Sequence, residues 1–571
     1  MKNNVLIADI FVKVAELLEI KVGNPFRIRA YLRAAEVIKN LQEDVVDFIQ
    51  QGRLEDLSGI GHDLAEKINE IVLTGTCKFY VELKKDVPDG VLEMLSIPSI
   101  GPKTARLFYE RLKIKSIEGL KKAASDGLLF SLPGIKEKTV ENILKGIDLV
   151  QKGQENMNLL IADKAAQQVL SILKEDAAVE KLVVAGSFRR MKETVRDIDI
   201  LVVCKKPGEI MDTFTHLPFA KRILAHGALK SAILTHDGAQ VDLRVSDSRS
   251  FGAALLYFTG SKSHNIRLRQ LAIKRGLKIN EYGLFDKKGH CIASKDEAGL
   301  YRALGLDFIA PELREDNGEI EAAQEGRLPH LVELKDIRGD FHVHTDYSDG
   351  VESIESMVDE ARRHNYDYVC LTDHSVSLKI AGGLDRAALK KKKRQIDALN
   401  ARLKDFKVLF GSEVEIDGDG RIDYDDGILA AFDIVIAAIH TGFKQSKKQL
   451  TKRIVKACQN KNVHMIAHPT GRLWPAREAY ELDFKEIFKA ARDTNTAFEI
   501  NAHPYRLDLN GQNARLAKEN GVKLAINTDS HNKDHLAYMK FGVGIARRAW
   551  LEKGDILNTL ALKELFKIIG K

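Results

Sequence analysis

The stretch that decides the fold reads Leu182-Val183-Val184-Ala185-Gly186-Ser187-Phe188-Arg189-Arg190, followed after a short polar segment by Asp197-Ile198-Asp199-Ile200-Leu201-Val202-Val203. The first apolar run predicts a buried strand that ends in a turn leading into a helix. The second predicts another strand, with Asp197 and Asp199 on one face, because side chains two apart in a strand point the same way. Two carboxylates on one face repel each other unless a divalent cation lies between them.

The glycine turn and a third carboxylate extend this pattern. Backbone N–H groups at Gly186 and Ser187, with Arg190 behind them, suit a polyanionic phosphate. Asp242 lies in the alternating segment 240–245 and faces away from Val241 and Leu243. An isolated Asp-x-Asp often only caps a strand edge, but the turn upstream and Asp242 downstream favour a two-metal site for nucleotidyl transfer.

Length and composition set the limits. With 571 residues the chain is too long for one core, and three or four domains are expected. Lys and Arg exceed Asp and Glu only mildly, 88 against 81, which permits a nucleic-acid partner without requiring one. Five scattered cysteines without CxxC spacing indicate reduced thiols and argue against cysteine-ligated zinc. The N-terminus is unlike a signal peptide, and no apolar run approaches the roughly 20 residues of a membrane span. We expect a soluble, cytoplasmic protein that binds no membrane.

Residues 1 to about 150 are predicted to be helical, with a repeated turn. Leu57-Ser58-Gly59-Ile60-Gly61 precedes a helix from His62 to Leu73, and Ile97-Pro98-Ser99-Ile100-Gly101-Pro102-Lys103 precedes another through Tyr109. A third copy, Leu132 to Lys136, has Lys136 in place of the second glycine. This helix-hairpin-helix pattern lets the backbone approach a DNA phosphate at Gly59, Gly61, Gly101 and Lys103. One copy could be a plain helix corner, whereas two intact copies favour binding of the DNA backbone.

The rest of the chain divides by composition. Residues 151–246 hold the carboxylates, and residues 247–310 form a small domain that contains Tyr257-Phe258-Thr259-Gly260-Ser261-Lys262. Segment 311–338, acidic in its middle and bracketed by prolines, is the expected linker. The basic run Lys390 to Arg394 is expected to be a solvated helix face.

After Gly339, short apolar strands alternate with amphipathic helices, which predicts a parallel barrel-like fold. The seven strand-like segments are 340–344, 368–374, 408–414, 434–440, 464–468, 497–501 and 523–529. Metal-ligand residue types stand at or near six of the strand ends: His342, His344, Asp349, His374, Glu413, His440, His468, Asp529 and His531. A set this large predicts two or three ions, and its nitrogen and oxygen donors suit Zn²⁺, Mn²⁺ or Fe²⁺. Without cysteine ligands the site should be catalytic, activating water against a phosphoester.

With these residues in view, the chain resembles, over essentially its whole length, the bacterial family X DNA polymerases that carry a C-terminal PHP (polymerase and histidinol phosphatase) domain. The resemblance implies a nucleotidyltransferase palm with two Mg²⁺ or Mn²⁺ ions. Asp197 and Asp199 would bind both ions, and Asp242, the third metal carboxylate, would help activate the primer 3′-hydroxyl. Gly186, Ser187 and Arg190 would hold the triphosphate.

The resemblance also implies contacts to the incoming nucleotide. Tyr257, Phe258, Gly260 and Ser261 match the segment under the sugar, where crowding disfavours a ribose 2′-hydroxyl. Asn265 and Arg269 match minor-groove contacts. Lys262 stands where animal members have an aspartate, which suggests an extra cation near the nucleotide.

The resemblance completes the domain plan. Residues 1–85 resemble the deoxyribose-phosphate lyase domain of animal repair polymerases, with Lys67 at the Schiff-base lysine but Arg27 and Asp63 at other lysine positions. Residues 86–150 would be a second DNA-binding domain, and residues 339–571 match the PHP pattern with every ligand present. By family analogy the PHP domain is a Mn²⁺-dependent 3′→5′ exonuclease, with abasic-site endonuclease or 3′-phosphodiesterase activity as further options.

The sequence therefore predicts a template-directed repair polymerase that fills short gaps and trims 3′ ends. Its expected partners are gapped or nicked duplex DNA and dNTPs, and it is expected to be a monomer associated with the nucleoid. The alternatives are a template-independent nucleotidyltransferase with a PHP phosphatase domain, a DNA-binding scaffold with relic sites, and a small-molecule phosphatase.

Overall fold

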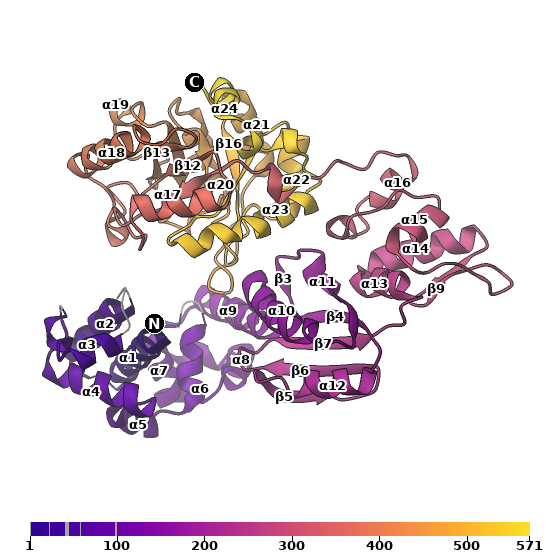
Figure 1. Ribbon diagram of the computed structural model, residues 1–571. Helices are drawn as coiled ribbons and strands as arrows, with labels where there is room; N and C mark the ends of the chain where they lie inside the picture. Colours follow the sequence, from indigo (N-terminus) through magenta and orange to yellow (C-terminus); the bar gives the residue numbers. More distant parts are fainter. Residues whose placement is uncertain (1, 22, 40–44, 58, 98–99, 571) are drawn as a thin grey trace. The chain divides into compact units, whose positions relative to one another are not determined.

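The computed structural model describes residues 2–21, 23–39, 45–57, 59–97 and 100–570 (Figure 1). The chain divides into two compact units, Met1–Gln154 with Pro475–Arg477, and Glu155–Trp474 with Glu478–Lys571. Ser58, Pro98 and Ser99 of the predicted hairpins lie outside the described residues.

The first unit is helical, as the sequence predicts. Its helices pack around one apolar core that includes Phe11, Tyr31, Ile68 and Phe108. The helices are α1 (Lys2–Ile20), α2 (Pro25–Lys39), α3 (Val45–Gln50), α4 (His62–Thr74), α5 (Lys78–Lys85), α6 (Asp89–Glu93), α7 (Pro102–Leu112), α8 (Ile117–Ser125) and α9 (Glu137–Glu155).

The second unit begins with an α+β domain built on a five-stranded sheet. The strand order is β2-β4-β7-β6-β5, in which β4 and β7 run parallel and the other neighbours antiparallel. The elements are β1 (Met157–Asn158), α10 (Leu159–Lys174), β2 (Val179–Val184), α11 (Gly186–Arg189), β3 (Thr194–Val195), β4 (Asp197–Cys204), α12 (Pro207–Thr215), β5 (Ala220–Ala225), β6 (Lys230–Thr235) and β7 (Gln240–Val245). The sheet therefore places the Asp-x-Asp strand directly beside the strand that carries Asp242.

A small domain follows, with its own apolar core. Its elements are α13 (Phe251–Thr259), α14 (Lys262–Lys274), β8 (Lys278–Asn280), β9 (Gly283–Phe285), β10 (Cys291–Ala293) and α15 (Glu297–Ala303). Leu313 and Ile320 belong to the same core, and Ile320 lies on a further helix, α16 (Glu319–Gln324). The first half of the expected linker is thus packed structure rather than an open connection.

The C-terminal region is the predicted parallel barrel. Seven strands are hydrogen-bonded in chain order and all neighbours run parallel: β11 (Gly339–Val343), β12 (Tyr368–Leu371), β13 (Lys407–Glu415), β14 (Ile434–Ala438), β15 (Met465–Ile466), β16 (Ala497–Asn501) and β17 (Leu524–Asn527). A parallel bridge between Val343 and Ser530 brings the end of the array back to its start. The barrel is therefore nearly closed.

Helices surround these strands (Figure 1). They are α17 (Ile354–Arg363), α18 (Arg386–Asn400), α19 (Asp426–Leu429), α20 (Lys447–Gln459), α21 (Phe484–Thr494), α22 (Gly511–Glu519), α23 (Met539–Arg548) and α24 (Leu562–Ile569). Among the described residues, no helix combines the length and apolar character needed to cross a membrane.

Candidate active sites

The three palm carboxylates lie on two adjacent strands. Asp199 and Asp242 are register partners across β4 and β7, and Asp197 lies two residues before Asp199 on the same strand. Lys230 Nζ lies 2.8 Å from Asp242 Oδ2, and Gln240 Nε2 donates to Asp242 Oδ1 at 2.9 Å. Burial, together with the negative charges of Asp197 and Asp242, raises the pKa of Asp199 to about 6. A divalent cation would relieve this repulsion, as the sequence predicts.

The turn after β2 packs directly against Asp199. Gly186 has a φ of 66°, and a Cβ built there would lie 2.5 Å from Asp199 Oδ2. The backbone N–H of Ala185 donates to the carbonyl of Asp199 at 2.7 Å. Glycine is required here both by the left-handed backbone and by the space. The phosphate turn and the carboxylate strand therefore form one packed unit.

Two adjacent arginines connect this turn to the small domain. Arg190 is buried; its Nε donates to Glu315 Oε1 at 3.0 Å and its Nη1 to the carbonyl of Thr259. Arg189 pairs with both oxygens of Glu297, at 2.9 and 2.7 Å, and also reaches the hydroxyl of Thr259 at 2.6 Å. Glu297 and Glu315 were not among the sequence-predicted residues, because their partners lie more than a hundred positions away.

The predicted nucleotide contacts gather beside this connection. Tyr257, Asn265 and Arg269 line one small pocket, and Asn265 Nδ2 donates to the carbonyl of Tyr257 at 2.8 Å. Ser261 caps α14 through its hydroxyl, which accepts from the N–H of His264, and exposed Lys262 is the first residue of that helix. The guanidinium carbon of Arg244 lies 4.6 Å from the centre of the Phe258 ring. Guanidinium nitrogens of Arg244 also lie within 4 Å of the carboxylate oxygens of Asp199 and Asp242.

Gly260 has a φ of 68°, and a Cβ there would lie 3.2 Å from Arg190 Nη1. The segment under the expected nucleotide therefore contacts the arginine expected to hold the triphosphate.

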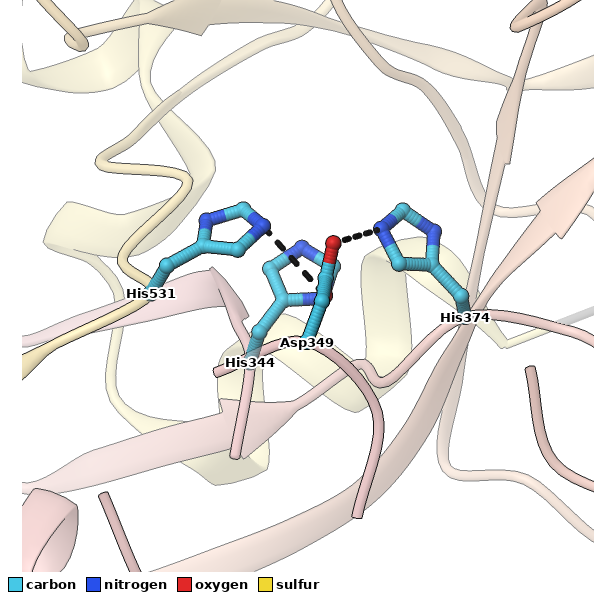
Figure 2. Close-up of side chains that lie close together, drawn as sticks. All are labelled: His344, Asp349, His374 and His531. Atoms are coloured by element: carbon cyan, nitrogen blue, oxygen red, sulfur yellow. Dashed lines mark ion pairs between the residues drawn. The ribbon is translucent and has the colours of Figure 1, made fainter. Parts of the chain in front are cut away.

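The barrel brings all nine predicted ligands into one cluster. Three groups have ligand atoms within 4.8 Å of one another: His344, Asp349, His374 and His531; His342, His344 and Asp529; and His374, Glu413 and His440. Figure 2 shows the first group, in which Asp349 lies between His374 Nε2 and His531 Nε2, at 3.4 Å from each. His468 Nε2 lies 2.8 Å from Glu413 Oε1, so this ligand joins the cluster through Glu413.

The donor atoms fit bound metal. Several are buried and have no hydrogen-bond partner among the described residues: His342 Nε2, both ring nitrogens of His344, His374 Nδ1, His468 Nδ1 and Glu413 Oε2. Buried polar atoms without partners are costly in a native fold, and a coordinated ion would satisfy them. Nitrogen and carboxylate oxygen without sulfur is the donor set of Zn²⁺, Mn²⁺ and Fe²⁺ sites.

The charges in this cluster are poorly matched without an ion. Although burial opposes it, Glu413 and Asp349 raise the pKa of His374 to about 10. Burial and the neighbouring rings of His531 and His374 lower the pKa of His344 to about 4. Strongly perturbed pKa values of adjacent buried imidazoles mark the cluster as a functional-site candidate.

A second layer of residues holds the ligands, and sequence reasoning missed it. Glu499 Oε1 lies 2.7 Å from His342 Nδ1, and Glu415 Oε2 lies 2.8 Å from His440 Nδ1. Each carboxylate fixes the ring nitrogen that would face away from a metal. Glu499 is on β16, the one barrel strand to which no ligand was assigned.

The basic run also differs from the expectation. Lys392 is fully buried and its Nζ lies 2.7 Å from Asp373 Oδ2, whereas Lys390, Lys391 and Arg394 are exposed. Asp373 also accepts from the N–H and hydroxyl of Thr345. One lysine of the run therefore supports the barrel interior beside His374.

The helix-hairpin-helix turns begin α4 and α7 as predicted. Gly61 and Gly101 cap these helices with extended backbone, and a Cβ built on either would meet no atom of the described residues within 4 Å. Lys103 is exposed in the first turn of α7. Open space beside the start of a helix is suited to the approach of a phosphate.

Lys67 lies on α4 and is held by its neighbours. Its Nζ lies 2.5 Å from Asp63 Oδ1 and 5.6 Å from the centre of the Phe79 ring, and its side chain is 13% exposed. It is thus less solvated than an ordinary helix-surface lysine. A Schiff-base role for Lys67 stays a prediction.

Four regions of the chain match models of known protein families. Family models match the chain as a helix-hairpin-helix domain over residues 2–77, a SAM-like helix-hairpin-helix tandem over 91–148, a DNA polymerase beta thumb over 254–315 and a PHP domain over 340–503. The chain is 38% identical over 555 residues, 97% of its length and 96% of the relative's, to DNA polymerase/3'-5' exonuclease PolX of Bacillus subtilis (strain 168).

Two more distant relatives each cover part of the chain. DNA polymerase lambda of Rattus norvegicus is 24% identical over 325 residues, which are 51% of this chain and 53% of the relative. A probable phosphatase of Thermoanaerobacter sp. (strain X514) is 29% identical over 231 residues, which are 38% of this chain and 89% of the relative.

Proposed function

The chain belongs to the PolX family of DNA polymerase/3′-5′ exonucleases, and on that premise we propose that it extends a DNA 3′ end across short gaps and trims 3′ ends at its PHP site. The observation that carries the first activity is the register of β4 and β7, which places Asp199 opposite Asp242 and against the Gly186 turn.

In the palm, Asp197 and Asp199 would hold two divalent cations, Mg²⁺ or Mn²⁺, which supply Lewis-acid stabilisation to the attacking and leaving oxygens. Asp242 accepts the proton of the primer 3′-hydroxyl. Gly186, Ser187 and Arg190 bind the triphosphate, and exposed Lys262 adds positive charge close to it. The segment from Tyr257 to Ser261 excludes the ribose 2′-hydroxyl, and Asn265 and Arg269 contact the minor groove.

In the barrel, the nine clustered ligands would hold two or three ions chosen from Mn²⁺, Zn²⁺ and Fe²⁺, which make bound water nucleophilic at neutral pH. Glu499 and Glu415 fix the orientation of His342 and His440. The helix-hairpin-helix turns would position the duplex by its backbone and read no sequence.

The test uses a gapped, 3′-labelled duplex with dNTPs and Mn²⁺. Asp199→Ala should abolish extension and leave trimming, and His344→Ala should do the reverse. The hypothesis of two independent sites is refuted if either variant loses both activities while its melting temperature remains that of the wild type. Incorporation independent of the template base would instead support the template-independent alternative.

A phosphomonoesterase activity of the PHP site is a second candidate, favoured by the similarity to the probable phosphatase. Release of inorganic phosphate from a 3′-phosphorylated duplex, lost in His344→Ala, would support it. Release from histidinol phosphate but not from DNA would favour the small-molecule alternative.

A further inference from the structure

Arg548, the last residue of α23 in the PHP region, contacts the polymerase palm within the same compact unit. Its Nη1 donates to the backbone carbonyl of Arg190 at 2.8 Å and to Glu315 Oε1 at 2.9 Å. The same oxygen of Glu315 accepts from Arg190 Nε at 3.0 Å. One carboxylate oxygen thus joins the expected triphosphate arginine to an arginine of the other catalytic domain.

This cluster is largely withdrawn from solvent. The side chains of Arg548, Glu315 and Arg190 are 13%, 19% and 10% exposed. Two guanidiniums and one carboxylate carry a net charge of +1. Without Arg548, the remaining pair of Arg190 and Glu315 would be neutral. The Glu315 carboxylate would then lie beside the expected triphosphate with only Arg190 to balance its charge. Charges this poorly solvated interact more strongly than surface pairs do.

The backbone beside Arg190 also sits on α23. A Cβ on Gly544 would lie 2.7 Å from the Met191 side chain, so Met191 occupies the space that this glycine leaves. Gly544 and Arg548 are four residues apart and therefore share one face of the helix. That face of α23 contacts two consecutive residues, Arg190 by a hydrogen bond and Met191 by packing.

We propose that Arg548 is a positioning residue for nucleotidyl transfer: through Glu315 and the Arg190 carbonyl it fixes the triphosphate arginine and keeps this cluster positive. The proposal rests on the proposed role of Arg190 in nucleotide binding. It makes dNTP affinity in the polymerase site depend on a side chain of the exonuclease domain.

The test is steady-state extension of a gapped duplex by the full-length protein, with dNTP titrated. Arg548→Gln should raise KM for dNTP about tenfold with a much smaller change in kcat, because an interaction that binds the ground state is lost. Arg548→Lys keeps the charge and should recover most of the affinity. Trimming of the same duplex without dNTP should not change, since Arg548 contacts none of the barrel ligands.

Arg547→Gln is the matched control, because Arg547 is the adjacent residue of α23 and pairs with Glu312 rather than Glu315. Its KM for dNTP should stay within twofold of the wild type. Glu315→Gln breaks the same link from its other end, so the double variant Glu315→Gln/Arg548→Gln should raise KM no more than the worse of the two single variants.

The proposal is overturned by an unchanged KM in Arg548→Gln, by an equal rise in Arg547→Gln, or by additive effects in the double variant. If Arg548→Gln does not fold, Arg548→Met and Arg547→Met replace the pair, and only the first should shift KM. Failure of the wild type to extend the primer would refute the proposed function itself, a result distinct from all of these.

Discussion

Lys392, in the middle of the most basic run of the chain, is fully buried with its ammonium 2.7 Å from the carboxylate of Asp373. The same ammonium donates to the carbonyl of Leu371 at 2.8 Å, at the end of β12. Asp373 directly precedes the candidate ligand His374. The pair therefore supports the part of the barrel from which one wall of the metal site is built.

Lys392→Met should destabilise the protein by about 3–5 kcal/mol, because it leaves the Asp373 carboxylate buried without its partner. Lys390→Met, in the same run but exposed, should change stability by no more than about 0.5 kcal/mol. Thermal and urea unfolding of both variants measure the difference. Equal stability of the two would mean that the buried pair contributes nothing.

Asp199→Asn should abolish extension and yet stabilise the metal-free protein at pH 8. The folded pKa of about 6 exceeds the ordinary value of 3.8, so the carboxyl favours folding when protonated, and this contribution is lost as pH rises through 6. Ionised Asp199 therefore costs at most about 3 kcal/mol above that pH. Melting temperatures in EDTA should differ most at pH 8 and converge below pH 4. A constant difference across pH would contradict the pKa shift.

Glu499→Gln should weaken Mn²⁺ binding at the barrel site by about 10–100-fold, because the ring of His342 loses the carboxylate that orients it. Glu564→Gln, on the exposed face of α24, should bind as the wild type does. Calorimetric titration of metal-stripped protein gives both affinities. If Glu499→Gln keeps wild-type affinity, the ring is held by packing alone.

Gly61→Val should weaken binding to gapped duplex about tenfold and lower stability by no more than about 1 kcal/mol, because valine is a poorer N-cap than glycine. The backbone at Gly61 is ordinary extended chain and the added side chain points into open space, so the expected loss comes from blocked approach of a phosphate. Gly208→Val, at another open glycine on α12, is the control. Fluorescence anisotropy with labelled DNA measures both, and equal affinities would remove the hairpin from the interface.

The sequence predicted the barrel and the residues that cluster in it as candidate ligands, because both signals are local. Each strand is a short apolar run, and His or Asp at its end is visible without any knowledge of partners. Lys392 was misjudged because like charges in a row suggest a solvated face. The signal that could have found it is the stripe Leu389, Lys392, Ile396 and Leu399, all buried on α18 at helical spacing.

Other residues could not be found in this way. Glu499 occupies an inward position of a buried strand, and its partner His342 is 157 positions away. Arg548 and Glu315 are 233 positions apart, and each lies in a segment with many other charges. The first pair depends on how the barrel strands come together and the second on how two domains pack, and no spacing rule along the chain contains either.

Because residue 186 is a glycine, the substrate specificity of this enzyme is hard to change at this turn. Asp199 fills the space that a side chain at position 186 would need. The distance between the candidate metal-binding carboxylates and the turn at Gly186 is therefore fixed by direct contact. Substrates of a different length must then be accommodated elsewhere, and attempts to broaden specificity would do better to vary the small domain than this turn.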